Sequence, residues 1–341
     1  AYERVAFIPP DRRGPGATGT GRVKAINRAS IPVCNKDHPT AMFLIRHNDV
    51  SDPAINLAME EVCLNNLDPG SEYLLFYINR PSIIIGRHQN PFQEFNQDLA
   101  RQKGIVALRR ISGGGAVYHD PGNLNFSFIT DFTDEKLDYF KTLLQPILNT
   151  LQRLGVPAQL TGKNAIQVDG QKVSGTSQHT NMRRMLSHGT LLFDSELGVL
   201  QQVLDSNLVI TRSRAVSSIK SKVTNISRYL RRPMDIHAFR AEMADGISNA
   251  FGELIEYRLT NDDWEAVDLL AQKKYSSWDW IYGRSPEFVV QHKISLDSGD
   301  VNAHLVVNKG VIKAVEMADP LAESLSPNKL INELIGARFD L

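Results

Sequence analysis

The sequence predicts an α+β fold in which helices pack against a mixed β-sheet and a small α+β accessory domain follows. Short apolar or alternating runs typical of strands recur from Phe43 onward, and amphipathic helical stripes interrupt them. A tryptophan-rich segment at residues 276–283 precedes three further strand-like runs and a helix. We therefore expect an irregular arm at residues 1–40, a main domain at 41–285 and a short accessory domain at 286–341.

Composition excludes several classes of function. The chain has 341 residues, with 38 Lys and Arg against 38 Asp and Glu. This neutral balance argues against nucleic-acid binding, which depends on a surplus of cations. The sequence contains no apolar run of about 18 residues, so we expect no membrane span. Cys34 and Cys63 have no metal-type spacing and suggest reduced cysteines in an intracellular protein.

The arm at residues 1–40 contains two glycine motifs that resemble nucleotide-binding loops. Residues 14–19 read GPGATG, which matches the dinucleotide fingerprint, and residues 16–22 read GATGTGR, which approaches a P-loop. The first lacks a flanking strand and helix. The second has Arg22 and Val23 where Lys and Ser or Thr are required. We therefore interpret both as parts of an irregular arm without a secretory signal.

The first elements of the main domain follow from capping and breaking residues. Asp52 and Pro53 form the N-cap and first position of a helix that ends before residues 68–70. Residues 73–86 then contain two apolar strands around an Asn-Arg-Pro turn, and residues 105–110 form another strand.

Two more strands, at residues 116–120 and 123–130, are separated by a turn at 120–123 whose Pro121 and Gly122 fit type II chemistry. Apolar and polar residues alternate along the second strand, which predicts one face in the core and one polar face. The two faces are Leu124, Phe126 and Phe128 against Asn123, Asn125 and Ser127.

The remaining elements include a long helix and a tight hairpin. The helix covers about residues 134–154, with a bend at Pro146 and a stop at Gly155. Asp169-Gly170 is a strong type I′ signal for a hairpin over residues 165–175. A strand at 189–194, helices at 198–204 and 236–254, three strands within 293–320 and a helix within 326–337 complete the prediction.

Three consecutive glycines, residues 113–115, follow an arginine pair between two strands. Without side chains, their N–H groups could face phosphate or carboxylate oxygens, although no Walker sequence follows them. Adjacent strand residues face opposite ways, so only one of the arginines can point into such a site. We favour Arg110 as a bidentate anion ligand, and a tight hairpin with a solvated arginine pair remains the alternative.

Lys172 lies directly after the predicted hairpin turn and is followed by Val173, Ser174 and Gly175. Small residues at these positions would allow a ligand to approach the ammonium group. A cation there could balance charge that develops on a phosphorus or acyl centre. The alternative is an ordinary surface lysine.

Five motifs together resemble the lipoate–protein ligase family. In chain order they are IGRHQNPFQEFN (85–96), RRISGGGAVYHDPGN (109–123), GQKVSGTSQ (170–178), HGTLLFD (188–194) and SIKSKVTNIS (218–227). The resemblance covers about residues 41–285 and implies a catalytic domain with the fold of biotin protein ligase and octanoyltransferase. It also implies that lipoate and ATP form lipoyl-AMP, and that the lipoyl group then passes to a lysine of a lipoyl domain.

The resemblance also implies roles for individual residues. Lys172 is the expected catalytic lysine, which contacts the carbonyl end of lipoate and the adenylate phosphate. Tyr77 lines the lipoyl tunnel or is an ordinary core tyrosine, and Asn164 neighbours Mg²⁺ or phosphate. His119 and His188 are expected to be structural or rim residues and not bases. The expected substrate and nucleotide contacts besides Lys172 are Arg110, Gly113, Gly114, Gly115, Ala116, Val117, Tyr118, Tyr77, Asn123, Asn164, Ser174 and Gly175.

Two departures from the family pattern leave alternatives open. Ala165 stands where the family usually has Asp after the asparagine, and the accessory domain is short. Loss of that carboxylate would affect Mg²⁺ handling or deprotonation of the acceptor lysine. A lipoyltransferase that uses preformed lipoyl-AMP, or a non-catalytic lipoyl-adenylate-binding protein, therefore remains possible. Lys220 and Lys222 could meet pyrophosphate, nucleotide or an acidic acceptor, or form a solvated basic face.

The expected reaction partners follow from the same resemblance. ATP, Mg²⁺ and lipoate would be the small ligands. The acceptors would be lipoyl domains of 2-oxoacid dehydrogenase E2 subunits and the glycine cleavage H protein. We expect a cytoplasmic monomer, with the mitochondrial matrix as the alternative location. An octanoyltransferase would need a cysteine acyl-enzyme, and neither Cys34 nor Cys63 is well placed for one.

Overall fold

A computed structural model describes residues 42–47, 49–132, 140–162, 164–219, 221–296, 299–317 and 328–339. The arm at residues 1–40, with its two glycine motifs and Cys34, lies outside the described residues. The same is true of Lys220 and of the first part of the helix predicted from residue 134.

The main sheet has eight strands in the order β12-β1-β2-β6-β10-β9-β8-β7. Strands β12, β1 and β2 are parallel, and every other pair of neighbours is antiparallel. The sheet is therefore mixed, as predicted. Its strands are β1 (Met42–Arg46), β2 (Glu72–Tyr77), β6 (Asn123–Asp131), β7 (Gln159–Thr161), β8 (Ala165–Val168), β9 (Gln171–Thr180), β10 (Arg184–Leu192) and β12 (Ile255–Arg258).

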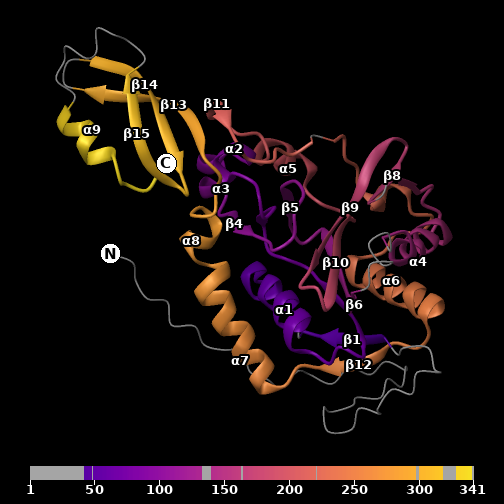
Figure 1. Cartoon of the computed structure of the whole chain (residues 1–341). Coiled ribbons are helices and arrows are strands. Elements are labelled where there is room, and N and C mark those ends of the chain that lie inside the picture. The colour runs from indigo at the N-terminus through magenta and orange to yellow at the C-terminus, as the bar shows by residue number, and fades with distance from the viewer. Residues whose placement is uncertain are drawn as a thin grey trace.

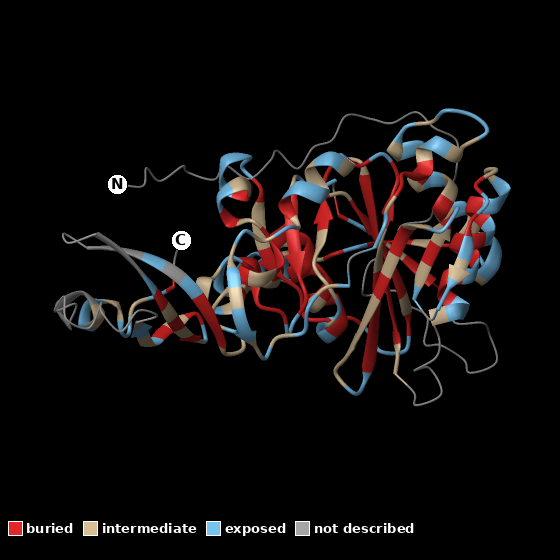
Figure 2. Cartoon of the chain, turned by 90° about the horizontal axis from the view of Figure 1, so that it is seen from above, coloured by how far each residue is buried: buried red, intermediate tan, exposed pale blue. Residues whose placement is uncertain are grey.

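Helices cover both faces of this sheet (Figure 1). Helices α4 (Phe140–Arg153) and α6 (Ile236–Phe251) pack on one face, and α1 (Pro53–Asn66) and α7 (Asn261–Leu270) pack on the other. The buried residues are concentrated in the strands and in the helix faces that meet them (Figure 2). Leu124, Phe126 and Phe128 lie in the core beneath α4 and α6, which confirms the predicted alternation in β6. The shorter helices are α2 (Pro91–Glu94), α3 (Gln97–Gln102), α5 (Leu197–Val203) and α8 (Trp278–Ile281), with a π-helix at Ala271–Tyr275 and a 3₁₀-helix at Ile226–Tyr229.

Local signals correctly located the first helix and the hairpin. The Asp52 carboxylate accepts hydrogen bonds from the backbone N–H groups of Ala54 (2.8 Å) and Ile55 (3.3 Å), which confirms the predicted N-cap. Asp169 and Gly170 have φ of 49° and 73°, as a type I′ turn requires.

The turn at residues 120–123 differs from its prediction. The Asn123 N–H donates to the Asp120 carbonyl at 3.0 Å, so the turn is closed. Gly122, however, is not among the residues with positive φ, and the type II prediction is wrong. A Cβ at Gly122 would lie 2.0 Å from the Asp194 carbonyl oxygen. Close approach of another chain segment, and not backbone conformation, is what requires glycine there.

A second, three-stranded sheet has the order β4-β3-β5 and carries the glycine loop, residues 110–116. Its strands are β3 (Ser82–Ile85), β4 (Val106–Arg109) and β5 (Val117–His119). Since β4 and β5 pair on opposite sides of β3, the glycine loop crosses the end of β3 and does not form the tight hairpin that was one alternative. A Cβ on Gly86, directly after β3, would lie 2.0 Å from the Gly114 carbonyl oxygen.

The accessory sheet lies at one end of the molecule, as Figures 1 and 2 show. It contains the three predicted strands β13 (Phe288–Leu296), β14 (Gly299–Asn308) and β15 (Val311–Met317), and helix α9 (Asn328–Leu334) follows. Its fourth strand, β11 (Val209–Ser213), comes from the main part of the chain and was not predicted. Phe92 of α2 also packs against Phe288 and Phe339 in this region. The accessory core therefore includes residues that precede residue 286.

Arg109 joins the end of β3 to α8. It is fully buried, and its guanidinium donates to the carbonyls of Gly86, Arg87 and Gln89 at 2.8–3.0 Å. It also donates to the carbonyls of Trp280 and Ile281. Arg110 is buried as well, so the prediction of a solvated arginine pair is wrong.

Within the described residues, no helix is long and apolar enough to cross a membrane.

We predict that Arg109→Met lowers the free energy of unfolding by about 3 kcal/mol or more, because several buried carbonyls would lose a charged donor. Urea denaturation followed by circular dichroism measures the change. Arg101→Met is the control, since Arg101 is an exposed arginine paired with Asp98 and its removal should cost less than about 1 kcal/mol. Equal losses in the two variants would contradict the structural role of Arg109.

Candidate active site

Lys172 lies at the start of β9, immediately after the type I′ turn. Its N–H donates to the Lys222 carbonyl at 2.8 Å, and its carbonyl accepts from the Thr224 N–H at 3.2 Å. The side chain lies over Gly175: a Cβ on that glycine would be 2.8 Å from both Cε and Nζ of Lys172. Gly175 therefore makes room for the ammonium group itself.

The Lys172 ammonium is partly buried and has no anionic partner among the described residues. Burial, and secondarily the charge of Arg110, lower its pKa. No hydrogen bond or ion pair to Nζ is formed by the residues that the structure describes. A cation in this state can interact with an incoming anion without first breaking a bond inside the protein.

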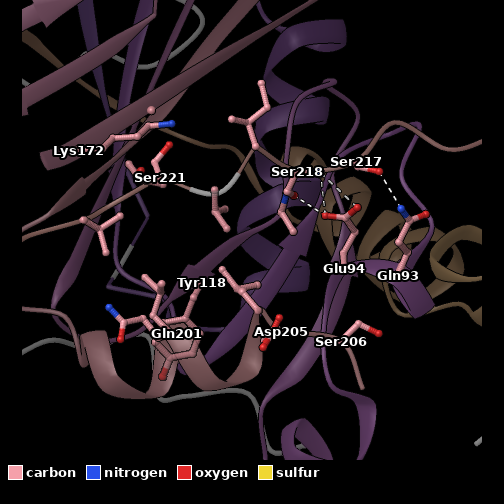
Figure 3. A pocket seen from close by; sticks show the side chains of 18 of the residues that line it. Gln93, Glu94, Tyr118, Lys172, Gln201, Asp205, Ser206, Ser217, Ser218 and Ser221 are labelled. Carbon is pink, nitrogen blue, oxygen red and sulfur yellow. Dashed lines mark hydrogen bonds between the residues drawn. The ribbon is translucent and has the colours of Figure 1, made fainter. Parts of the chain in front are cut away.

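Two cavities meet at Lys172. The inner cavity, which reaches Tyr77 and His188, has a volume of about 420 Å³. The outer cavity, which reaches Gln201 and Asp205, has a volume of about 570 Å³. Lys172, Gly175, Ala116 and Val117 line both. Figure 3 shows the outer cavity, with Lys172 and Ser221 on one side and Glu94 and Ser218 on the other.

A buried polar network surrounds the far end of the inner cavity. The Tyr77 hydroxyl donates to the Glu60 carboxylate at 3.0 Å, and the Ser127 hydroxyl donates to the same oxygen. His188 Nδ1 lies 2.9 Å from the other oxygen of Glu60, and its Nε2 lies 2.6 Å from Ser112 Oγ. Burial and Glu60 raise the pKa of Tyr77, so its hydroxyl remains a donor. Tyr77 thus lines the cavity and is also part of the core.

The position of Arg110 corrects the expectation that it presents a free pair of donors to an anion. Its guanidinium donates to the carbonyls of Ile84 (3.0 Å), Gly113 (2.6 Å) and Gly115 (2.8 Å). Its Nε donates to Ser112 Oγ at 3.0 Å. Four of the five N–H donors of the side chain are therefore used inside the protein, three by the loop itself and one by β3. Arg110 lines the inner cavity and contributes positive charge, but in this structure it holds the glycine loop.

The three glycines have different surroundings. Gly114 has φ of +89°, a conformation that other residues rarely adopt. A Cβ on Gly115 would lie 3.0 Å from Ser218 Oγ, whereas a Cβ on Gly113 would meet nothing within 4 Å. What approaches this loop in the structure is the chain itself, at Gly86 and at Ser218.

The structure brings most of the predicted site residues to the two cavities. Those that line at least one cavity are Tyr77, Arg110, Gly114, Gly115, Ala116, Val117, Tyr118, Asn164, Lys172, Ser174 and Gly175. Gly113 and Asn123 line neither. Asn123 is buried and donates to Asn125 Oδ1 at 3.0 Å; Asn125, two residues along on the same face of β6, reaches the inner cavity instead.

The residues near Asn164 do not fit a resident Mg²⁺ site. Asn164 Nδ2 donates to the Thr176 carbonyl at 2.8 Å, which leaves only the amide oxygen as a ligand. Ala165 supplies none. No cluster of three His, Cys, Asp or Glu side chains suited to a metal occurs in the described part of the chain. Mg²⁺ usually combines one or two carboxylates with substrate phosphates, and this position lacks the carboxylate.

Several residues at the site were not singled out from the sequence. Glu94 and Ser218 lie inside two of the quoted motifs, but nothing in either motif indicates that they contact each other across the fold. Glu60 occupies the buried face of α1, where a helical stripe predicts only core packing. Cys63 is fully buried, and burial raises its pKa, which agrees with the expectation that it is no acyl-enzyme nucleophile.

Comparison with known proteins supports the motif-based resemblance. The model of the lipoyl protein ligase A/B catalytic domain matches residues 52–248. Lipoate-protein ligase LplJ of Bacillus subtilis is 41% identical over 301 residues, which cover 88% of this chain and 91% of that protein. The chain belongs to the lipoate–protein ligase family. Lipoate–protein ligase 1 of Staphylococcus aureus matches with the same identity and coverage.

Solved structures of the family agree with the fold. A lipoate protein ligase of T. acidophilum with bound lipoic acid superposes with a TM-score of 0.61 at 25% identity, and the match covers 72% of this chain and 99% of that one. A lipoate-protein ligase A bound with ATP superposes with a TM-score of 0.60 at 26% identity over 71% and 98% of the two chains. The α+β ligase fold predicted from the sequence is thereby confirmed.

We predict that Gly114→Ala weakens stability and site function together. A side chain at φ of +89°, 3.0 Å from Arg110 Nη2, should destabilise by about 1–2 kcal/mol and displace the loop. Gly113→Ala is the matched control, because the added Cβ meets open space and should change little. Thermal melting and calorimetric titration with a lipoyl-AMP analogue measure both effects. A Gly114→Ala protein with wild-type melting and affinity would contradict the strained-loop interpretation.

Proposed function

We propose that this protein is a lipoate–protein ligase, which activates lipoate with ATP to lipoyl-AMP and transfers the lipoyl group to a lysine of a lipoyl domain. The observation that carries the proposal is the Lys172 ammonium at the junction of two cavities, where no group of the described chain pairs with it. Relatives named lipoate–protein ligases, at 41% identity over most of the chain, support it. So do the related structures with bound lipoic acid and with ATP.

The two cavities suit the two parts of the intermediate. The lining of the inner cavity includes apolar residues such as Leu57, Ile84 and Val117, which suit an acyl chain. The outer cavity presents Gln201, Asp205 and Ser206, polar groups that the inner cavity lacks and that suit a nucleotide. An acyl-adenylate that spans both would place its mixed anhydride beside Lys172.

A charge-balancing lysine fits both steps. In the first step the lipoate carboxylate forms an O–P bond to the α-phosphate and pyrophosphate leaves, which concentrates negative charge at one centre. In the second step a neutral amine forms a C–N bond to the acyl carbon, the C–O bond to AMP breaks, and the amine loses a proton. The Lys172 ammonium can stabilise the phosphate oxygens in the first step and the departing AMP in the second.

The acceptors we propose are lipoyl domains of 2-oxoacid dehydrogenase E2 subunits and the glycine cleavage H protein. A related bipartite ligase of Thermoplasma acidophilum is described together with its E2 lipoyl domain, which supports the first class. We propose a cytoplasmic monomer that uses ATP with Mg²⁺ supplied as the nucleotide complex.

Ala165 favours a second candidate function, a transferase that uses preformed lipoyl-AMP. Ala165 pairs directly with Gly175 across β8 and β9, so its side chain lies on the same face as the Lys172 ammonium. A carboxylate expected from the family pattern would lie there, and its absence removes an acidic group beside the reacting centre.

We predict that Lys172→Ala abolishes both half-reactions and leaves the fold intact. The loss should correspond to about 2–4 kcal/mol of transition-state stabilisation, the scale for a preorganised electrostatic group. Pyrophosphate release with lipoate and ATP reports the first step, and single-turnover transfer from preformed lipoyl-AMP reports the second. Lys103→Ala, at an exposed helix end, is the control and should match wild type. Near-normal transfer by folded Lys172→Ala protein would refute the assignment.

We predict that Ala165→Asp raises the rate of lipoyl transfer with little change in lipoyl-AMP affinity. A carboxylate at this position could orient the incoming lysine amine, whose free pKa is about 10.4 and which must lose its proton to attack. The measurement is single-turnover transfer from preformed lipoyl-AMP at pH 7 to 9. A rate that is unchanged or lowered would show that the carboxylate is not needed. Pyrophosphate release by the wild-type chain distinguishes ligase from transferase.

A further inference from the structure

Residues 214–219, here called the bridging segment, connect the accessory sheet with the site. The segment continues directly from β11, and the Arg214 N–H donates to the Glu287 carbonyl at 3.0 Å beside β13. Its Ser217, Ser218 and Ile219 line both the inner and the outer cavity. The bridging segment therefore forms part of the boundary between the two cavities.

Ser218 connects the bridging segment to the glycine loop by hydrogen bonds. Its hydroxyl accepts hydrogen bonds from the Ala116 N–H at 2.9 Å and from Gln89 Nε2 at 3.0 Å. The same hydroxyl donates to the Glu94 carboxylate, and the Ser218 N–H also donates to that carboxylate, 3.2 Å from Oε2. A serine hydroxyl has one proton and two lone pairs, so every hydrogen-bonding capacity of this group is used.

Glu94 determines the direction of these bonds. Because the carboxylate takes the hydroxyl proton, both lone pairs of Ser218 Oγ are available to the glycine loop and to Gln89. Gln89 is itself fixed, since its Oε1 accepts from the Gly86 N–H at 2.8 Å. The absence of a side chain on Gly115 allows Ser218 this close, as a Cβ there would lie 3.0 Å from its oxygen.

A carboxylate at this buried position costs desolvation free energy. Glu94 is only 6% exposed, and no cation in the described residues pairs with it. Burial raises the pKa of Glu94, because desolvation disfavours the charged form of the carboxylate. A neutral amide could accept the same two bonds at lower desolvation cost, but without the charge that makes them stronger. The carboxylate also lines a cavity that suits an anionic nucleotide, so its charge does not serve ligand attraction.

We propose that Glu94 is a positioning residue of the ligase, which through Ser218 holds the bridging segment against the glycine loop and fixes the boundary between the acyl and nucleotide cavities. The inference rests on the proposed function. Helix α2, which carries Glu94, also packs Phe92 against Phe288 and Phe339 of the accessory core. Helix α2 therefore connects the contact between Glu94 and Ser218 to the accessory core as well.

The test uses Glu94→Gln, Ser218→Ala and the double variant in the full chain. The probe is a lipoyl-adenylate sulfamate analogue, titrated by calorimetry, alongside the KM for ATP in pyrophosphate release. We expect each single variant to bind the analogue roughly tenfold more weakly and to raise the KM for ATP by a similar factor, the scale for one hydrogen bond to a charged group. The kcat should change far less, and the double variant should be no worse than either single variant.

Melting temperature separates positioning from simple folding. Removal of the unpaired charge in Glu94→Gln should leave the melting temperature unchanged or higher. The matched control is Glu256→Gln, a buried carboxylate at the far edge of the main sheet that pairs with Arg46 and Arg258. It should show the opposite pattern, with a lower melting temperature and wild-type affinity for the analogue.

Wild-type affinity in both single variants, or fully additive losses in the double variant, would overturn the role of Glu94 and leave the ligase proposal standing. A wild-type chain that neither releases pyrophosphate nor binds the analogue would overturn both.

Discussion

The crossing of the glycine loop over the end of β3 is the constraint on which the site depends. It is possible only because Gly86 has no side chain where the Gly114 carbonyl passes. Arg109 and Arg110 then stabilise the crossing, because each donates hydrogen bonds to main-chain carbonyls beside it. Since a buried guanidinium is stable only when its donors are satisfied, the arginine pair and the loop conformation stabilise each other.

This arrangement leaves Lys172 as an unusual cation. Arg109, Arg110 and Arg184 are buried and directed at main-chain carbonyls. Lys172 instead lies over Gly175 with no acceptor in the described chain, and Arg110 nearby lowers its pKa further. These three arginines are thus stabilised internally, whereas the Lys172 ammonium has no such partner among the described residues and lies at the junction of the cavities. Such a preorganised charge suits a reaction whose difficulty is the accumulation of anionic oxygens.

The accessory sheet is joined to this centre by more than a linker. Strand β11 leads into the bridging segment, and α2 contacts the accessory core through Phe92 and the bridging segment through Glu94. A change in the packing of the accessory sheet would therefore alter the boundary between the cavities through both connections, β11 and α2. The short C-terminal part of the chain is consequently not peripheral to the site.

The sequence by itself determined what depends on short-range chemistry and on the conjunction of motifs. The Asp52 cap, the Asp169-Gly170 turn and the alternation in β6 each follow from neighbouring residues, and the five motifs together indicated the family. Tertiary structure alone decided which groups meet. Whether Arg110 faces a ligand or its own loop depends on the position of Ile84 and of the loop carbonyls, and the contact of Glu94 with Ser218 joins segments more than a hundred residues apart. Pairings of this kind leave no local pattern, because each partner alone has the sequence of an ordinary loop or helix residue.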